Sequence, residues 1–110
     1  MVRQSKAVIA SKYYEKHLTE VLEYGMETFG FNQAVKYYNT ITHLVEGLHC
    51  NYTFHPECRH LATKSRIYRN IILDSHLVIY RITEECIEVL DIIHSASNPQ
   101  KIRNVRKIRL

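Results

Sequence analysis

Residues 68–82 read YRNIILDSHLVIYRI, and this stretch decides the fold class. Its first part, up to Leu73, belongs to a run at 66–73 that is rich in Ile and Tyr, as β-strands are. Asp74 and Ser75 then offer a two-residue turn. The segment that follows, HLVIYRI at 76–82, is apolar on both faces of a pleated strand, as a central strand is. The stretch therefore predicts a β-hairpin whose second strand lies at the centre of a sheet.

The chain beyond this hairpin predicts one more strand and a basic tail. Residues 83–85 form a further turn, and 86–93 are a third apolar strand. Asn98 followed by Pro99 is typical of a helix N-terminus, because Asn caps helices and proline is favoured at the first helical position. We expect a short basic helix or ordered extension there, with an apolar stripe that faces other apolar surface. The stripe comprises Ile102, Val105 and Ile108.

Before the hairpin, the apolar residues recur at helical spacing instead. A short apolar run at 6–10 precedes Ser11, a residue type that caps helices well. A first amphipathic helix extends from there to Gly30, and a second covers 31–48. Because so few residues separate them, the two helices form an antiparallel hairpin. The stripe of the first comprises Tyr14, Leu18, Val21, Leu22, Gly25 and Phe29, and that of the second Ala34, Tyr37, Tyr38, Ile41, Val45 and Leu48.

The order of elements is thus strand, helix, helix, strand, strand, strand and basic tail. This order predicts an α+β domain in which the helical hairpin packs on one face of a small, mostly antiparallel sheet. At 110 residues the chain has the length of one domain. We expect residues 1–98 to form that domain and residues 99–110 to be a basic C-terminal extension.

Positive charge is concentrated in two segments, although the net charge is only +4. Residues 101–110 contain five basic residues and no acidic one, whereas the other hundred hold 10 basic and 11 acidic residues, a balance of −1. In 59–80 a weaker cluster is opposed only by Asp74; it consists of Arg59, Lys64, Arg66 and Arg69. This pattern suits an acidic partner, either a nucleic acid or an acidic protein. A plain nucleic-acid-binding module is one alternative, and it predicts binding that weakens steeply with salt.

The composition argues against several other classes of protein. No apolar run is long enough to span a membrane, and the N-terminus lacks an apolar stretch of signal-peptide length. Three cysteines without regular spacing favour a reducing cytoplasm. The segment HCNYTFHPECRH at 49–60 is rich in Cys and His, but structural zinc sites need ligand pairs at short spacing. We expect no metal and no cofactor.

Four stretches in order resemble the RelE/ParE superfamily of bacterial toxins from type II toxin–antitoxin pairs. They are ASKYYEKHLTEVLEY at 10–24, HPECR at 55–59, the hairpin at 68–82 and IEVLDIIHSASNPQKI at 87–102. The resemblance covers most of the chain and is closer to the ParE-like, plasmid-stabilisation branch. It implies a growth inhibitor that a cognate antitoxin neutralises in a toxin–antitoxin hetero-oligomer.

The two branches of the superfamily imply different chemistry. ParE-like members are described as binding a protein target such as DNA gyrase without catalysis, whereas RelE-like members cleave mRNA on the ribosome. Cleavage needs a base, an acid and cations around the phosphorane. The candidates for those roles are His94, Arg66, Arg69 and Arg81. Because residues 95–97 read Ser-Ala-Ser where RelE has Gly-Lys-Arg, we expect a non-catalytic toxin, with mRNA endoribonuclease activity as the alternative.

The basic residues also mark candidate contacts to the antitoxin or the target. These are Arg66, Arg69, Arg81, His94, Lys101, Arg103 and Arg106. Residues three apart on one strand point to opposite faces, so Arg66 and Arg69 are expected to act separately. His94 is expected to be a strand-end histidine that is hydrogen-bonded to a loop, and Tyr80 to lie in the core.

Overall fold

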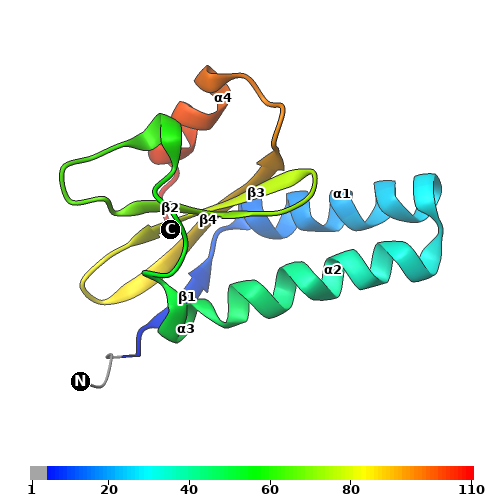
Figure 1. Cartoon of the computed structure of the whole chain (residues 1–110), viewed down its shortest axis with the longest axis horizontal. Helices are drawn as coiled ribbons and strands as arrows, with labels where there is room; N and C mark the ends of the chain where they lie inside the picture. Colours follow the sequence, from blue (N-terminus) through cyan, green and yellow to red (C-terminus); the bar gives the residue numbers. More distant parts are fainter. Residues whose placement is uncertain (1–4) are drawn as a thin grey trace.

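The protein forms three layers, in which a β-sheet lies between a helical hairpin and a smaller C-terminal layer (Figure 1). The structure, a computed structural model, describes residues 5–110. The strands are β1 (Ala7–Ala10), β2 (Tyr68–Ile72), β3 (His76–Ile82) and β4 (Cys86–His94). Their order is β1-β4-β3-β2, and only β1 and β4 pair in parallel among these four strands of the described chain. The predicted α+β class and mostly antiparallel sheet are confirmed.

The helical layer begins and turns where the sequence predicts. Its helices are α1 (Lys12–Phe29), α2 (Phe31–Glu46) and the short α3 (Leu48–Asn51). Ser11 caps α1, because its Oγ accepts a hydrogen bond from the Tyr14 N–H at 3.0 Å. Gly30 separates α1 from α2 with φ of 94° and ψ of 163°, a conformation nearly restricted to glycine. Within residues 5–110, no helix has the length and apolar character needed to cross a membrane.

The larger hydrophobic core lies between this hairpin and one face of the sheet. Burial of apolar surface here supplies the main driving force for packing the two layers together. Both predicted stripes contribute to this core, but each does so mainly through the half of its helix nearer the sheet. The buried residues include Tyr14, Leu18, Ile41, Val45, Leu48, Ile71, Val78, Tyr80, Ile87, Val89 and Ile92.

The outer end of the hairpin protrudes beyond the sheet (Figure 1). The two helices approach each other closely there, since a Cβ atom on Gly25 would lie 3.1 Å from the Cβ of Ala34. The sequence prediction placed Phe29 on the buried stripe, and this was wrong: Phe29 is 60% exposed. The reason is geometric, because the stripe continues past the point where the sheet can cover it.

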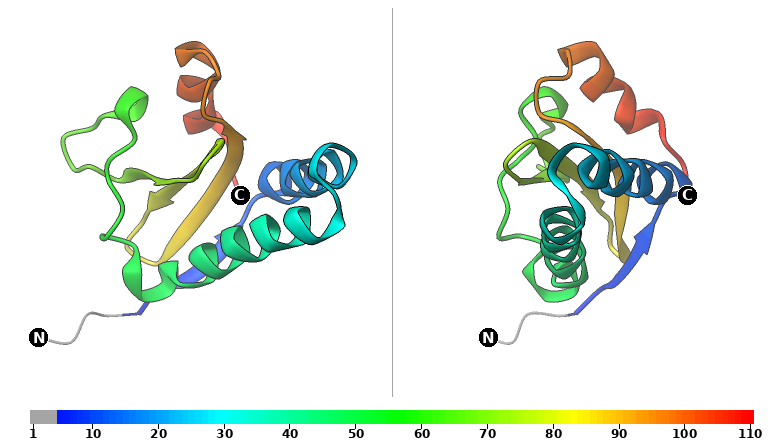
Figure 2. Two further views of the ribbon diagram at one scale, coloured as in Figure 1. Left: turned by 45° about the vertical axis from the view of Figure 1, so that its right-hand side comes forward. Right: turned by 90° about the vertical axis from the view of Figure 1, so that its right-hand side faces the viewer.

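The C-terminal segment covers the opposite face of the sheet (Figure 2). This layer contains α4 (Pro99–Asn104) and the 3-10 helices η1 (Arg59–Leu61) and η2 (Val105–Lys107). Asn98 caps α4 as predicted, with its Oδ1 accepting a hydrogen bond from the Lys101 N–H at 2.9 Å. Ile102 and Val105 are 4% and 3% exposed, and they pack with Leu61 in a second core. The tail is therefore ordered, and both faces of the sheet are covered rather than one.

A bulge interrupts the pairing of the two central strands. Ile79 pairs with Asp91 and Tyr80 with Val89, so Leu90 has no partner on β3. Next to it, the Nδ1 atom of His17 on α1 lies 2.6 Å from Oδ1 of Asp91. The bulge thus coincides with a polar link between the hairpin and β4.

Candidate functional site

Arg81 is the most deeply buried of the predicted site residues, at 9% exposure. On the face of the sheet away from the hairpin, its Nε donates a 2.7 Å hydrogen bond to Oε1 of Glu88. Its Nη atoms donate to the Tyr68 hydroxyl at 3.3 Å and to the carbonyls of Arg106 and Ile108 at 3.4 and 3.2 Å. Arg81 therefore holds the C-terminal segment against the sheet, and its guanidinium is engaged within the protein.

Arg69 is likewise engaged with backbone carbonyls. Its Nη1 donates to the carbonyls of Thr53 and His55 at 3.1 and 3.0 Å, and its Nε donates to the carbonyl of Arg66 at 3.0 Å. Glu57 forms a β-bridge with Arg69, so the segment before η1 lies along the outer edge of β2. Arg69 thus fastens this loop to the sheet edge.

Arg66 lies outside the strand on which the sequence analysis placed it. The strand begins at Tyr68, and Arg66 has φ of 56°, a left-handed conformation that is uncommon for a residue with a side chain. Its side chain is 71% exposed, and its Nε lies 3.6 Å from Oε1 of Glu57. The expectation that Arg66 and Arg69 occupy opposite faces of one strand was therefore wrong, because the chain turns between them.

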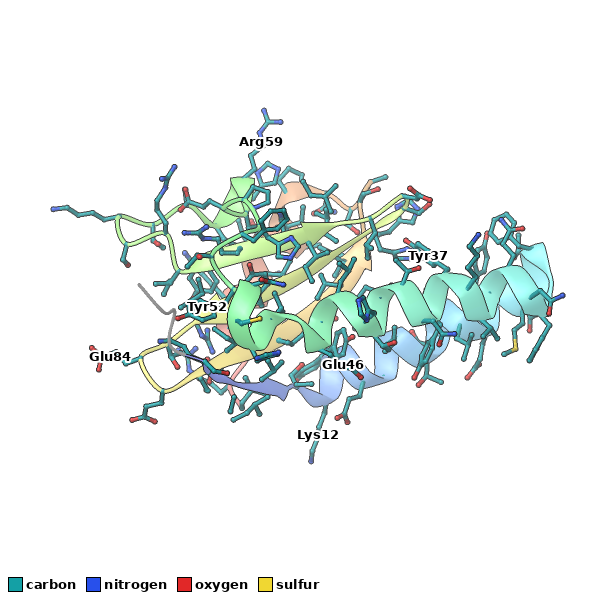
Figure 3. The ribbon with its side chains drawn as sticks, turned by 60° about the horizontal axis from the view of Figure 1, so that its bottom comes forward. Lys12, Tyr37, Glu46, Tyr52, Arg59 and Glu84 are labelled. Carbon is teal, nitrogen blue, oxygen red and sulfur yellow. The ribbon has the colours of Figure 1, made fainter. Side chains whose placement is uncertain are left out.

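His94 ends β4 and pairs across the sheet with His76. The two rings lie 5.5 Å apart, and the Nδ1 of His94 accepts a hydrogen bond from the Ala96 N–H at 3.0 Å. The hydroxyl of Tyr37, the α2 residue labelled in Figure 3, contacts Nδ1 of His76 at 3.0 Å. Burial and, to a smaller extent, the neighbouring His94 lower the pKa of His76. His94 is the loop-bonded strand-end histidine that the sequence predicts.

These candidate residues do not form one constellation. His76 stands opposite His94, whereas Arg81 lies five positions further along β3, which is about 16 Å away in an extended strand. The internal bonds of Arg69 and Arg81 direct both guanidinium groups at backbone carbonyls. No base, acid and paired cations converge on a single point among these residues.

Tyr80 is a core residue, as the sequence predicts. Its side chain is fully buried, and its hydroxyl donates a 2.7 Å hydrogen bond to the carbonyl of Tyr52. Burial raises the pKa of the Tyr80 hydroxyl, while Arg69 opposes that shift. A buried phenol held in this way cannot reach a bound substrate.

The Cys- and His-rich segment 49–60 contributes mainly to folding. Cys58 is 1% exposed in the second core, and burial raises the pKa of its thiol. Its N–H donates to the carbonyl of Tyr68 at 2.9 Å, which ties the segment to β2. Within the part of the chain that the structure describes, no three His, Cys, Asp or Glu side chains are grouped so as to hold a metal ion.

The remaining candidates, Lys101, Arg103 and Arg106, are exposed on α4 and η2. Sequence reasoning missed a second exposed surface, the hairpin tip, which we define as Tyr24, Met26, Phe29 and Phe31. These side chains are 63%, 37%, 60% and 65% exposed, and the rings of Tyr24 and Phe29 meet edge to face at 6.5 Å. Only the cluster of large apolar residues on both sides of Gly30 signals this surface in the sequence.

Comparison with known proteins agrees with this architecture. A family model described as "ParE toxin of type II toxin-antitoxin system, parDE" matches residues 8–99. A solved structure described as "Chromosomal ParDE TA system from P. aeruginosa" is similar with a TM-score of 0.67 and 14% identity, over 83% of this chain and 97% of that chain. No curated protein matches the sequence. Because the family model spans most of the chain, the protein belongs to the ParE toxin family of type II toxin–antitoxin systems.

Proposed function

We propose that the protein is the toxin of a type II pair and inhibits growth by binding a protein target such as DNA gyrase, without catalysis. We further propose that a cognate antitoxin neutralises it in the cytoplasm. Membership of the ParE family supports the toxin assignment. The observation that carries the non-catalytic reading is the internal engagement of Arg69 and Arg81.

RNA cleavage through a phosphorane needs cations that are free to face the transferring phosphoryl group. Arg69 and Arg81 would have to break hydrogen bonds to backbone carbonyls before they could do so. His94 is exposed, but its Nδ1 already accepts a hydrogen bond from the Ala96 N–H. In the neutral ring this hydrogen bond places the proton on Nε2, so His94 would have to give up the contact with Ala96 before Nδ1 could act as a base. The chain's own geometry therefore favours binding over chemistry.

The experiment that tests this reading combines the His94→Ala variant with mapping of mRNA ends after induced expression. We expect His94→Ala to inhibit growth as strongly as the natural protein, and we expect no codon-phased cuts with either. Inhibition of supercoiling by purified gyrase at rising toxin concentration would identify the target. Loss of toxicity in His94→Ala together with codon-phased cuts in the natural protein would establish the nuclease alternative instead.

We propose that the antitoxin covers the hairpin tip. Aromatic residues and Met are enriched at protein–protein interfaces. Here they are exposed at the end of the α1–α2 hairpin that the sheet does not cover. An antitoxin segment that folds on binding could bury these rings. The double variant Phe29→Ser, Phe31→Ser should weaken antitoxin binding about 30-fold or more, as loss of aromatic anchors typically does.

Tyr13→Ser provides the matched control, because Tyr13 is 54% exposed at the other end of α1. It should leave the antitoxin affinity unchanged. If the double variant binds antitoxin normally but no longer inhibits growth, the tip belongs to the cellular target and this assignment is wrong. A neighbouring gene for a short protein with DNA-binding and disordered parts would supply the antitoxin for the test.

A further inference from the structure

Two segments far apart in the sequence carry most of the positive charge. Together they hold eight exposed cationic side chains, and residues 59–66 and 99–110 contain no acidic residue. We define these eight residues as the basic surface. They are Arg59, Lys64, Arg66, Lys101, Arg103, Arg106, Lys107 and Arg109.

The fold brings the two segments together on the face of the sheet away from the hairpin. Helix η1 packs against α4, and Leu61 shares the second core with Ile102 and Val105. The two helices lie side by side in the views of Figure 1 and Figure 2. With its apolar side chains directed inward, the C-terminal segment presents its cations outward, and Arg59 projects away from the body of the molecule (Figure 3).

The positive charge of the basic surface is not neutralised within the protein. Within residues 5–110, Arg66 is the one member with a carboxylate within 4.0 Å, that of Glu57. Arg103 on α4 and Arg106 on η2 are three residues apart, and like charges at such spacing along a helical segment repel each other. Arg103 and Arg109 donate hydrogen bonds to Oε1 of Gln100 and to the carbonyl of Arg106, but these neutral acceptors leave the positive charge uncompensated. An anionic partner would compensate it.

The neighbouring side chains favour a phosphate backbone over an acidic protein. The cations alternate with small polar residues such as Gln100, Asn104 and Thr63. Apart from Leu110 at the chain end, none of the large apolar side chains exposed in the described chain belongs to these two segments. Arg occurs at protein interfaces as well as on phosphates, but protein interfaces also rely on buried apolar and aromatic anchors, which these two segments lack. Single-stranded nucleic acids also need aromatic rings on which bases stack, so duplex is favoured over single strand.

We propose that the basic surface binds the phosphate backbone of duplex DNA, without reading its base sequence. The proposal does not depend on the toxin's target, and it concerns a face of the molecule separate from the hairpin tip. If four of the eight cations contact phosphates, affinity should fall about 150-fold between about 50 and about 200 mM salt, and if six do, about 2,000-fold.

The test measures fluorescence anisotropy of the purified full-length protein with a labelled duplex of about 20 base pairs, in two unrelated sequences. A tail variant carries Lys101→Gln, Arg103→Gln and Arg106→Gln, and a loop variant carries Arg59→Gln, Lys64→Gln and Arg66→Gln. A control variant carries Lys12→Gln, Lys16→Gln and Lys36→Gln on the hairpin, where these lysines are exposed. Each variant loses three positive charges, so the three differ in position rather than in net charge.

We expect the tail and loop variants to bind duplex at least about tenfold more weakly than the control variant, with a shallower salt dependence. Both duplex sequences should bind equally. All substituted side chains are exposed, and a thermal melt of each variant establishes that the fold is retained.

Three results would overturn the proposal. Equal weakening by all three variants would mean that net charge alone attracts DNA. Binding of single-stranded DNA or duplex RNA that is tighter than that of duplex DNA would contradict the partner proposed. The partner would instead be an acidic protein if a polyglutamate peptide bound as tightly as the duplex and if the tail and loop variants weakened its binding equally.

Discussion

Replacing Arg81 by Met should release the C-terminal segment from the sheet and lower the free energy of unfolding. Met keeps the length of the side chain but donates none of the four hydrogen bonds that Arg81 makes. It also leaves the carboxylate of Glu88 without its cation, although the Glu88 side chain is only 20% exposed. Breaking a largely buried ion pair costs about 3 kcal/mol, and the longer bonds to the two tail carbonyls add about 1 kcal/mol.

The expected loss is thus about 3–4 kcal/mol, which corresponds to a fall in Tm of about 12 °C or more for a domain of this size. Urea unfolding of Arg81→Met, Glu88→Met and the double variant measures the coupling directly. The double variant should regain much of this free energy, because neither charge of the Arg81–Glu88 pair is then left buried without its partner. Hydrogen exchange should show faster opening of 105–110 in Arg81→Met. The role assigned to Arg81 would be refuted if Arg81→Met lowered the free energy of unfolding by less than about 1 kcal/mol and left hydrogen exchange of residues 105–110 unchanged.

Three further substitutions and one deletion test other features of the fold by urea unfolding. Gly30→Ala should cost about 1–3 kcal/mol because of its positive φ, whereas Gly47→Ala, at a helical φ of −67°, should be neutral or slightly stabilising. Tyr80→Phe removes the core hydrogen bond to Tyr52 and should cost about 1 kcal/mol without changing growth inhibition. Deleting residues 101–110 should cost about 3–5 kcal/mol by exposing the second core, and a fully stable truncated protein would instead favour a dispensable extension after residue 98.

The elements of this fold could be predicted from sequence because their signals are local. Ser11 and Asn98 act on N–H groups three residues away, and Gly30 acts through its own backbone angles. Such signals lie within a single turn of helix. The continuous apolar run of β3, on both faces of the pleat, likewise indicates a central strand without knowledge of its neighbours.

The partners of the arginines could not be predicted in this way. Arg69 reaches a carbonyl 16 residues away, and Arg81 reaches carbonyls 25 and 27 residues away. A sequence records that these side chains are cationic, but only the folded chain determines which carbonyl groups surround them. For the same reason, the exposure of Phe29 could not be predicted. It depends on how far the sheet extends beneath the hairpin, whereas helical periodicity shows only which residues share a face of the helix.

The parallel pairing of β1 with β4 has a consequence for the order in which the protein folds. Ala7 pairs with Cys86, so β1 cannot join the sheet until β4, the last of the four described strands, has been synthesised. The α1–α2 hairpin, by contrast, depends on contacts close in sequence, which form early. We therefore expect pulsed hydrogen exchange during refolding to find amides of α1 protected before those of β1. A chain that lacks β4 therefore cannot hold β1 in the sheet, because β4 is the strand with which β1 pairs in the described chain.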